Sequence, residues 1–238
     1  MFSCGIAAKQ MADKVNARIV SNGVKGEVHT YSVTDYAESV INAASGVYSD
    51  KAVNAVKAML NYGTAAQQYF GYNTDNPANS IMTDDDKNMD MVGFNTYTGK
   101  LVNADSVSGI SYYGSSLVLE SDTILRNYFE LSDGYSIDNY TFYVKDKDGN
   151  KNIIAPQKTD ASLYYIDISN VKAYELADNV NIYVQKNGDS EDKIMMLEYG
   201  AYVYARYVDK YLDNTALKNL MTAMYHYCNA ATEYANIY

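Results

Sequence analysis

The segment that follows the first long helical stretch carries side-chain oxygens at the spacing of a calcium loop. Acidic or amide side chains occupy every second position there, at Asp84, Asp86, Asn88 and Asp90, as the first four ligands of such a loop do. Met89 stands where the loop needs glycine, and Asn95 stands where a bidentate glutamate closes the site. The four residues are candidate metal ligands, and a solvated acidic linker is the favoured interpretation.

Residue types that catalyse reactions are few in this chain. It has two histidines, and histidine is the commonest general acid or base. His29 is expected in a strand and His226 on a polar helix face, so both are interpreted as solvated surface residues. Cys228 is expected beside an apolar helix stripe, as a packed thiol. We therefore predict no catalytic residue and no cofactor, and a glycoside hydrolase fragment with paired carboxylates is the one catalytic alternative.

Tyrosine is the residue type that could carry binding, since its ring is rigid and apolar and its hydroxyl is polar. The chain has 26 Tyr, 5 Phe and no Trp. Most of the tyrosines at helical spacing are expected in a core, namely Tyr36, Tyr62, Tyr69, Tyr199, Tyr227 and Tyr234. Tyr202 and Tyr225 fall on faces expected to be polar, and Arg206 lies beside Tyr202. Tyr202, Tyr225 and Arg206 are the candidate ligand-binding residues.

Composition excludes several classes of function. The 238 residues carry 19 Lys and Arg against 29 Asp and Glu, a net charge of −10. A surface this acidic repels phosphate backbones, so we expect no nucleic-acid partner. No segment approaches the roughly 20 apolar residues of a membrane-spanning helix, and we expect no membrane insertion. No signal peptide stands at the start of this chain, and the two cysteines do not form a disulfide framework.

Two stretches of the chain resemble each other at a constant spacing. Residues 11–16 (MADKVN) match residues 176–181 (LADNVN), and Asp13 matches Asp178 at an offset of 165. Asn22-Gly23 matches Asn187-Gly188 at the same offset, and five positions of the helix at 51–70 match the helix at 215–235. The matched acids each precede a strand, where aspartate commonly bonds its own backbone. The chain therefore contains two copies of one unit.

The matched residues also predict the elements of each copy. Two hairpins are expected, one formed by residues 15–20 and 28–33 and the other by residues 180–184 and 194–197. In each, Asn-Gly follows the first run and is the strongest short signal of a hairpin turn. Apolar residues at helical spacing predict helices at 35–44, 51–70, 198–209 and 215–235. Four further strands are expected only in front of the second copy, at 116–120, 123–131, 140–145 and 162–168, and Asp146-Lys147-Asp148-Gly149 is expected to be a hairpin turn.

These elements predict an α+β fold. A sandwich-like half rich in strands is followed by a hairpin and two packed helices, used twice, and the first copy lacks its front half. The expected boundaries are residues 1–73 for the end of the first unit, 74–104 for an acidic polar linker and 105–238 for a complete second unit. We expect self-association through the edge that the truncated copy leaves open.

Three segments resemble a known type of repeat module. They are ISYYGSSLVLESDTILRNY at 110–128, AVKAMLNYGTAAQQYFGYN at 55–73 and ALKNLMTAMYHYCNAATEY at 216–234. They are similar to a Tyr-rich repeat module of large secreted or cell-surface proteins from anaerobic gut bacteria. The resemblance implies an extracellular or cell-surface host protein built of several modules, and it implies no catalytic residue.

The expected function is non-catalytic: a module that presents or spaces a protein-binding surface on a host or cell surface. A carbohydrate-binding module is one alternative, and it predicts two or three tyrosines in line on one sheet face with Asp and Asn beside them. An immunoglobulin-binding surface module is another, and it predicts an exposed aromatic patch of several hundred square ångströms, roughly the size of a small interface.

Overall fold

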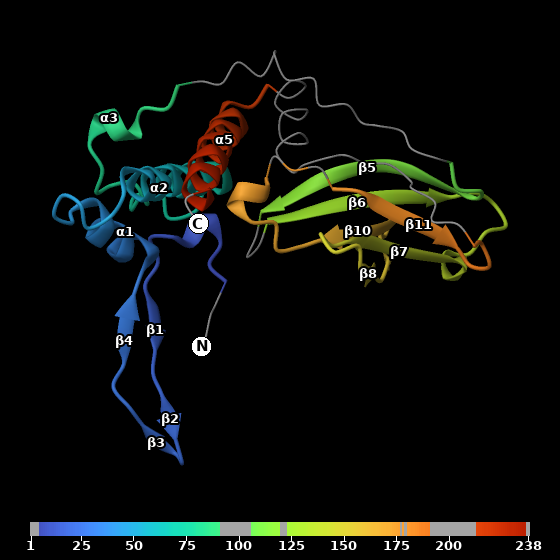
Figure 1. Ribbon diagram of the computed structural model, residues 1–238, viewed down its shortest axis with the longest axis horizontal. Helices are drawn as coiled ribbons and strands as arrows, with labels where there is room; N and C mark the ends of the chain where they lie inside the picture. Colours follow the sequence, from blue (N-terminus) through green and yellow to red (C-terminus); the bar gives the residue numbers. More distant parts are fainter. Residues whose placement is uncertain are drawn as a thin grey trace. The chain divides into compact units, whose positions relative to one another are not determined.

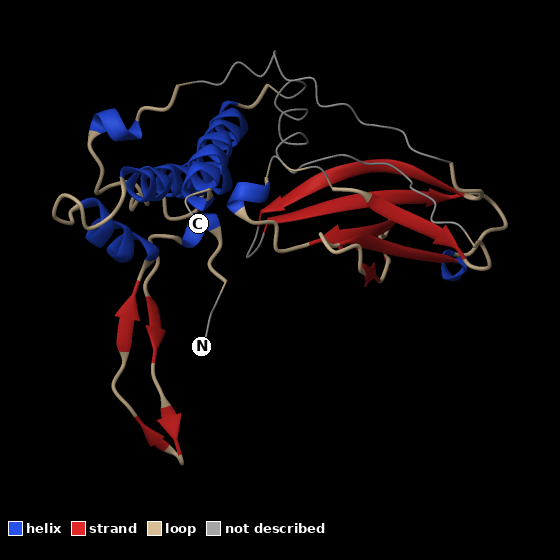
Figure 2. Cartoon of the chain, in the orientation of Figure 1, coloured by secondary structure: helices blue, strands red, loops and turns tan. Residues whose placement is uncertain are grey.

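The computed structural model describes residues 5–90, 106–119, 123–176, 178, 180–190 and 213–236. They fall into two units: unit 1 comprises residues 1–93 and 212–238, and unit 2 comprises residues 94–211. The longer helices belong to unit 1, together with one long hairpin, whereas unit 2 consists mainly of strands (Figure 2). The mixed helix and sheet content confirms the predicted α+β class.

Unit 1 contains four α-helices among the described residues: α1 (Val33–Ile41), α2 (Asp50–Phe70), α3 (Asp84–Lys87) and α5 (Thr215–Ala235). Each begins after a polar residue whose side chain accepts a hydrogen bond from a backbone N–H in the first turn. These residues are Ser32, Ser49, Thr83 and Asn214. Such caps satisfy donors that have no partner within the helix and set its first residue.

The two 21-residue helices, α2 and α5, pack side by side (Figure 1). The Tyr62 and Tyr227 rings stack between them, with centroids 5.8 Å apart. Residues 60–67 of α2 and 220–224 of α5 are all buried, so each helix is covered on more than one side in this stretch. The buried apolar residues are Leu60, Tyr62, Ala65 and Ala66 of α2 and Leu217, Leu220, Met221, Ala223 and Met224 of α5.

The hairpin that precedes α1 in the sequence extends away from the helices of unit 1 (Figure 1). A 3-10 turn, η1 (Ala8–Gln10), precedes four short strands: β1 (Val15–Ala17), β2 (Val20–Ser21), β3 (Val24–Lys25) and β4 (His29–Tyr31). β1 pairs with β4 and β2 with β3, both antiparallel. Asn22 and Gly23 reverse the chain with φ of 51° and 81°, the left-handed conformation that a two-residue hairpin turn requires. We call residues 14–31 the arm.

Unit 2 contains two antiparallel sheets. One has four strands in the order β5-β6-β10-β9 and the other has three in the order β11-β7-β8. Their bounds are β5 (Ile110–Leu119), β6 (Thr123–Leu131), β7 (Tyr140–Lys145), β8 (Lys151–Ile154), β9 (Gln157–Lys158), β10 (Tyr164–Ile168) and β11 (Ile182–Lys186), with 3-10 turns η3 (Ile137–Asn139) and η4 (Ala173–Glu175). Residues 146–150 form the predicted turn between β7 and β8, where Asp146 accepts hydrogen bonds from Asp148 and Asn150.

Side chains from both sheets of unit 2 form one core. Leu125, Phe129 and Ile166 of the four-stranded sheet are buried together with residues of the other sheet. The Phe129 and Phe142 rings lie 5.0 Å apart, centroid to centroid. Buried and less buried residues alternate along β6, which is the pattern of a strand with one face in a core.

The structure corrects the predicted boundaries. Helix α5 was expected to complete a unit of residues 105–238, but it belongs to unit 1. The reason is that α2 and α5 carry the same apolar stripe, and the two stripes cover each other. The predicted linker at 74–104 is also wrong for its first half, since Ala78 and Met82 are 0% and 5% exposed in unit 1. Residues 91–104 lie outside the described residues.

Several tyrosines predicted in the core are exposed. Tyr36 is 60% exposed, and Tyr69 and Tyr234, at the last turns of α2 and α5, are 37% and 38% exposed. Tyr62 is buried, as predicted. Tyr227 is half-buried. The prediction is wrong for Tyr69 and Tyr234 because the last turns of α2 and α5 extend beyond the contact between the helices, and it is wrong for Tyr36 because this residue lies on the exposed side of α1. Tyr199 lies outside the described residues.

Candidate functional site

The arm exposes a set of apolar side chains. Every residue from 16 to 31 is exposed. The large apolar side chains among them, with exposed fractions of 50% to 78%, are Ile19, Val20, Val24, Val28 and Tyr31. Soluble proteins expose single apolar residues freely, but a contiguous set on one element commonly marks an interaction site. The arm is therefore the candidate functional site.

Contacts at the base of the arm fix it to α1. Lys14 Nζ lies 2.6 Å from a carboxylate oxygen of Asp35, in the first turn of α1. This hydrogen bond from the Lys14 ammonium lowers the pKa of Asp35. Across the hairpin, the Thr30 hydroxyl donates to Asn16 Oδ1 at 2.6 Å. These polar contacts lie at the base, beside Tyr31, and Ile19, Val20, Val24 and Val28 lie farther along the arm.

The charge of the arm opposes that of the chain. Lys14, Arg18 and Lys25 against Glu27 give 3 − 1 = +2, in a chain of net charge −10. An exposed strand can accept a strand from another protein through its backbone groups, while alternate side chains supply specificity. In the arm, the apolar and basic side chains are the groups that would set the specificity of such pairing.

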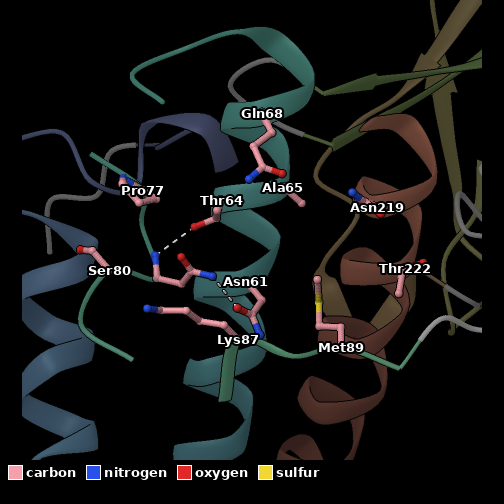
Figure 3. A pocket seen from close by; sticks show the side chains of 11 residues that line it. Asn61, Thr64, Ala65, Gln68, Pro77, Ser80, Lys87, Met89, Asn219 and Thr222 are labelled. Atoms are coloured by element: carbon pink, nitrogen blue, oxygen red, sulfur yellow. Dashed lines mark hydrogen bonds between the residues drawn. The ribbon is translucent and has the colours of Figure 1, made fainter. Parts of the chain in front are cut away.

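Unit 1 also contains a cavity of about 430 Å³ beside α2 and α5 (Figure 3). Polar groups that line it form hydrogen bonds between α2 and the segment that follows α2. The Asn79 backbone N–H donates to Thr64 Oγ1 at 2.9 Å, and Asn79 Nδ2 donates to Asn61 Oδ1 at 2.8 Å. Asn61 in turn donates to the carbonyl of Asp86. These contacts attach residues 79–86 to α2, and they explain why polar residues occur on a buried helix face.

A buried glutamine next to this cavity stabilises the same segment. Gln67 is 1% exposed. Its amide nitrogen donates to the carbonyls of Asn73 and Asn76, and its oxygen accepts from the Ala78 N–H at 2.8 Å. We expect Gln67→Met to lower the free energy of unfolding of unit 1 by about 1–3 kcal/mol, because buried backbone groups lose their partners. Urea unfolding measures this change.

The neighbouring residue supplies the control for that measurement. Gln68 is exposed, so Gln68→Met is expected to leave the urea midpoint nearly unchanged. Equal effects of the two substitutions would contradict the role given to the Gln67 amide.

Among the candidate metal ligands, Asp86 is engaged in other contacts. Residues 84–87 form the short helix α3, and Asp86 is paired with Lys57 Nζ at 2.7 Å and with the Thr83 hydroxyl at 2.9 Å. In the described part of the chain, no three His, Cys, Asp or Glu residues are placed to hold one metal ion. The alternating pattern is replaced by a helical turn capped by Thr83, and Asp86 anchors that turn to α2.

The Asp86 pair predicts a dependence of stability on pH. Hydrogen bonding to Lys57 lowers the pKa of Asp86 below its ordinary value of 3.8. A carboxyl group whose pKa is lower in the folded protein than in the unfolded chain stabilises the fold at pH values above the unfolded pKa. This contribution is lost as the pH falls through the folded pKa. We expect Asp86→Asn to lower the free energy of unfolding by about 0.5–1 kcal/mol at pH 7. The difference in unfolding free energy between the two proteins should shrink below pH 3.8. Urea titrations at pH 7 and pH 3 measure this difference. A difference that is equal at both pH values would contradict the stabilising role of the Asp86–Lys57 pair.

Two of the three candidate binding residues, Tyr202 and Arg206, lie outside the described residues. Tyr225 is half-buried on α5, and its ring makes an edge contact with His226 at 5.6 Å between centroids. The face that it shares with Thr222 is not a solvated one, since Thr222 is 1% exposed. Tyr225 thus lies at the margin of the helix packing, not on an open surface.

Other residues singled out from the sequence have structural contacts. His226 is half-buried, and its Nε2 lies 2.9 Å from the carbonyl oxygen of Asp90, so it is only partly solvated. His29 is exposed, as predicted. Cys228 is 2% exposed, the packed thiol that was predicted. Asp13 accepts from the Tyr72 hydroxyl at 2.6 Å, not from its own backbone. This contact raises the pKa of Tyr72.

The four-stranded sheet partly meets the requirement for a carbohydrate platform. Tyr128 and Tyr165 are register partners on β6 and β10, and Asp167 lies two residues along. Arg126, however, forms a two-point ion pair with Asp167 and lies 4.1 Å from the centroid of the Tyr165 ring. The hydrogen bond to Asp167 raises the pKa of Arg126. The guanidinium thus covers the ring on which a sugar would stack.

The sequence did not predict the arm as a site, because its apolar residues have the pattern of an ordinary hairpin strand. One signal was present: Ile19 lies in a β-branched run that leads into Asn22-Gly23. That pattern predicts a strand, and it does not tell whether the strand is covered.

Comparisons with known proteins do not identify a relative. No family model matches the chain, and no curated protein or solved structure matches it. None of the helices in the described part of the chain has the length and apolar character needed to span a membrane.

Proposed function

We propose that this chain is a non-catalytic module that presents a protein-binding surface, and that the arm is this surface. The observation that carries the proposal is the exposure of five large apolar side chains on one hairpin fixed to α1. In keeping with the resemblance in its Tyr-rich segments, we place the module in a secreted or surface-anchored bacterial protein, outside the cell.

The polar residues support a non-catalytic role. Catalysis requires convergent polar groups that are free to meet a substrate. In the described ranges, the cavity of unit 1 is bordered by amide and hydroxyl groups that already bond to backbone or to each other, as Asn61, Thr64 and Asn79 do. Of the acids, Asp13, Asp35 and Asp86 are held by hydrogen bonds or ion pairs.

We also propose that residues 11–73 and 176–238 are two copies of one unit. The 3-10 turns at 8–10 and 173–175 are 165 residues apart, and so are both ends of the helices at 50–70 and 215–235. Met11 and Leu176, which follow the turns, are both buried. Tandem copies of a weak binding surface gain avidity from their high effective concentration.

A carbohydrate-binding module is the second candidate. Tyr128 and Tyr165 share one sheet face, as it requires, but the Arg126 guanidinium over the Tyr165 ring counts against it. An immunoglobulin-binding module is a specific form of the first candidate. One experiment separates them: the chain is screened against a glycan array and against host serum and mucosal proteins, immunoglobulins included.

The screen is repeated with two matched variants. Ile19 and Ile153 are 78% and 72% exposed, and only Ile19 lies on the arm. We expect Ile19→Asp to weaken protein binding by about tenfold or more, and Ile153→Asp to leave it unchanged. Glycan binding that is lost in Tyr165→Ala and kept in Ile19→Asp would replace the first candidate by the second. Silence on both panels by the folded chain would contradict the carbohydrate candidate and a host protein as the partner of the arm.

A further inference from the structure

Corresponding strands of the two proposed copies have opposite environments. At the offset of 165, the arm residues 17–21 correspond to β11, residues 182–186. Val184 is 0% exposed in the core of unit 2, whereas its counterpart Ile19 is 78% exposed, the highest value among the large apolar side chains that the structure describes. Ile182 is also fully buried, and its counterpart Ala17 is exposed. One strand of the unit is therefore covered and its equivalent is not.

The element that covers β11 is known. β11 pairs antiparallel with β7, with Ile182 opposite Val144, Val184 opposite Phe142 and Lys186 opposite Tyr140. Transferring this register to the arm places Ala17 opposite a residue in the position of Val144, and Ile19 opposite one in the position of Phe142.

The arm sequence is compatible with this pairing on both faces. Ile19 has the size and shape to fill the core position of Val184, since both are β-branched and apolar. On the other face, the Tyr183 ring stacks on Tyr143 with centroids 5.1 Å apart and an angle of 6°. The corresponding arm residue is Arg18, and a guanidinium stacks on an aromatic ring as an aromatic side chain does.

We propose that the arm is a donor strand for another copy of the same module. Residues 17–21 add to the β7 edge of the β-rich half of a second copy, in the register that β11 uses. The proposal rests on the arm's role as a protein-binding surface and gives the identity of the partner. In the described chain β7 lies between β11 and β8, so the arm binds a copy whose β11 has left this edge.

Cross-linking between two chains tests the register directly. Val20 corresponds to Gln185, whose partner in the register is Thr141. A full-length chain with Val20→Cys and a differently tagged chain with Thr141→Cys are unfolded, refolded together and oxidised. We expect an inter-chain disulfide between positions 20 and 141, at a yield several-fold above that of Val47→Cys, an exposed position outside the arm. Each substituted chain also carries Cys4 and Cys228. Each one, refolded and oxidised without the other, therefore measures the background of disulfides that these two cysteines form.

A second variant raises the population of vacant edges. Ile182→Asp with Val184→Asp removes the core side chains of β11, and we expect this full-length chain to self-associate in size-exclusion chromatography with light scattering. Adding Ile19→Asp should restore the monomer, whereas adding Ile153→Asp should not. Association that persists with Ile19→Asp, together with cross-linking no higher than that of Val47→Cys, overturns the proposal.

The outcome is independent of the binding screen. If a panel protein binds through Ile19 while positions 20 and 141 do not cross-link, the arm is a binding surface for a different protein and only the donor-strand inference is wrong. If cross-linking succeeds and the panel is silent, the arm serves assembly of the module with itself.

Discussion

Replacing Phe129 with alanine is expected to lower the free energy of unfolding of unit 2 by about 3–5 kcal/mol. Phe129 is fully buried, and its ring lies 6.0 Å from that of Tyr112 and 5.0 Å from that of Phe142, centroid to centroid. Truncation removes both aromatic contacts and leaves a cavity between the two sheets. A rigid core at a sheet-to-sheet contact cannot close around a missing ring without moving the strands.

Hydrogen exchange followed residue by residue measures this effect and shows where it acts. Amides of β6, β7 and β10 should exchange faster in Phe129→Ala, while those of α2 should not change. Glu130→Ala is the matched control, because Glu130 is the next residue of β6 and is exposed. Faster exchange in α2 as well would show that the two units unfold together.

Replacing Leu220 with alanine is expected to destabilise unit 1 by about 2–5 kcal/mol. Leu220 is 0% exposed on α5, and α5 packs on α2, where Leu60 is also 0% exposed. Residues at the start and the end of the chain thus share one core. A substitution near the C-terminus should therefore destabilise elements that begin at residue 8.

The control for this prediction is Asn229→Ala, an exposed position of the same helix. Amides of α2 should lose protection in Leu220→Ala and keep it in Asn229→Ala, with β6 unchanged in both. If Leu220→Ala loosened β6 and spared α2, helix α5 would belong with the β-rich half, as was predicted from the sequence.

The stability of unit 1 is expected to affect how the arm is held. The arm joins unit 1 through Lys14 and Asp35 and through the chain that enters α1. The core of α2 and α5 supports that base. The arm itself has few buried contacts, so its conformation depends on the Asn22-Gly23 turn and the two short ladders. We expect that destabilising unit 1 weakens presentation of the arm, whereas destabilising unit 2 does not.

Local sequence signals predicted some elements well and missed others: α3, β8 and β9 were not predicted, and β5 begins six residues before the predicted strand at 116–120. The bounds of β6 and β7 match those expected from alternation and turn residues, and α2 and α5 begin within one residue of the predicted starts. Serine and asparagine caps and the Asn-Gly turn act through contacts a few residues apart, so they operate whatever the rest of the chain does.

The pairing of elements was decided by tertiary structure. The apolar stripe around Met224 predicted that α5 packs on something, and the structure shows that this is α2, with Tyr62 against Tyr227. Gln67 and Asn79 were not predicted as buried, because their burial depends on contacts between α2 and the segment that follows it. Hydrophobic periodicity reports that a face is apolar, and it contains no information about which other face will cover it.

The arm shows this division most clearly. The sequence by itself determined a hairpin with apolar residues and an α+β composition, and it contains two stretches of similar sequence at an offset of 165. Only the tertiary structure decided that Val184 is buried against β7 while Ile19 is exposed. The physical reason is that strand formation is set by local geometry and turn residues, whereas burial of a strand requires a partner edge, which the described residues supply for β11 and not for the arm.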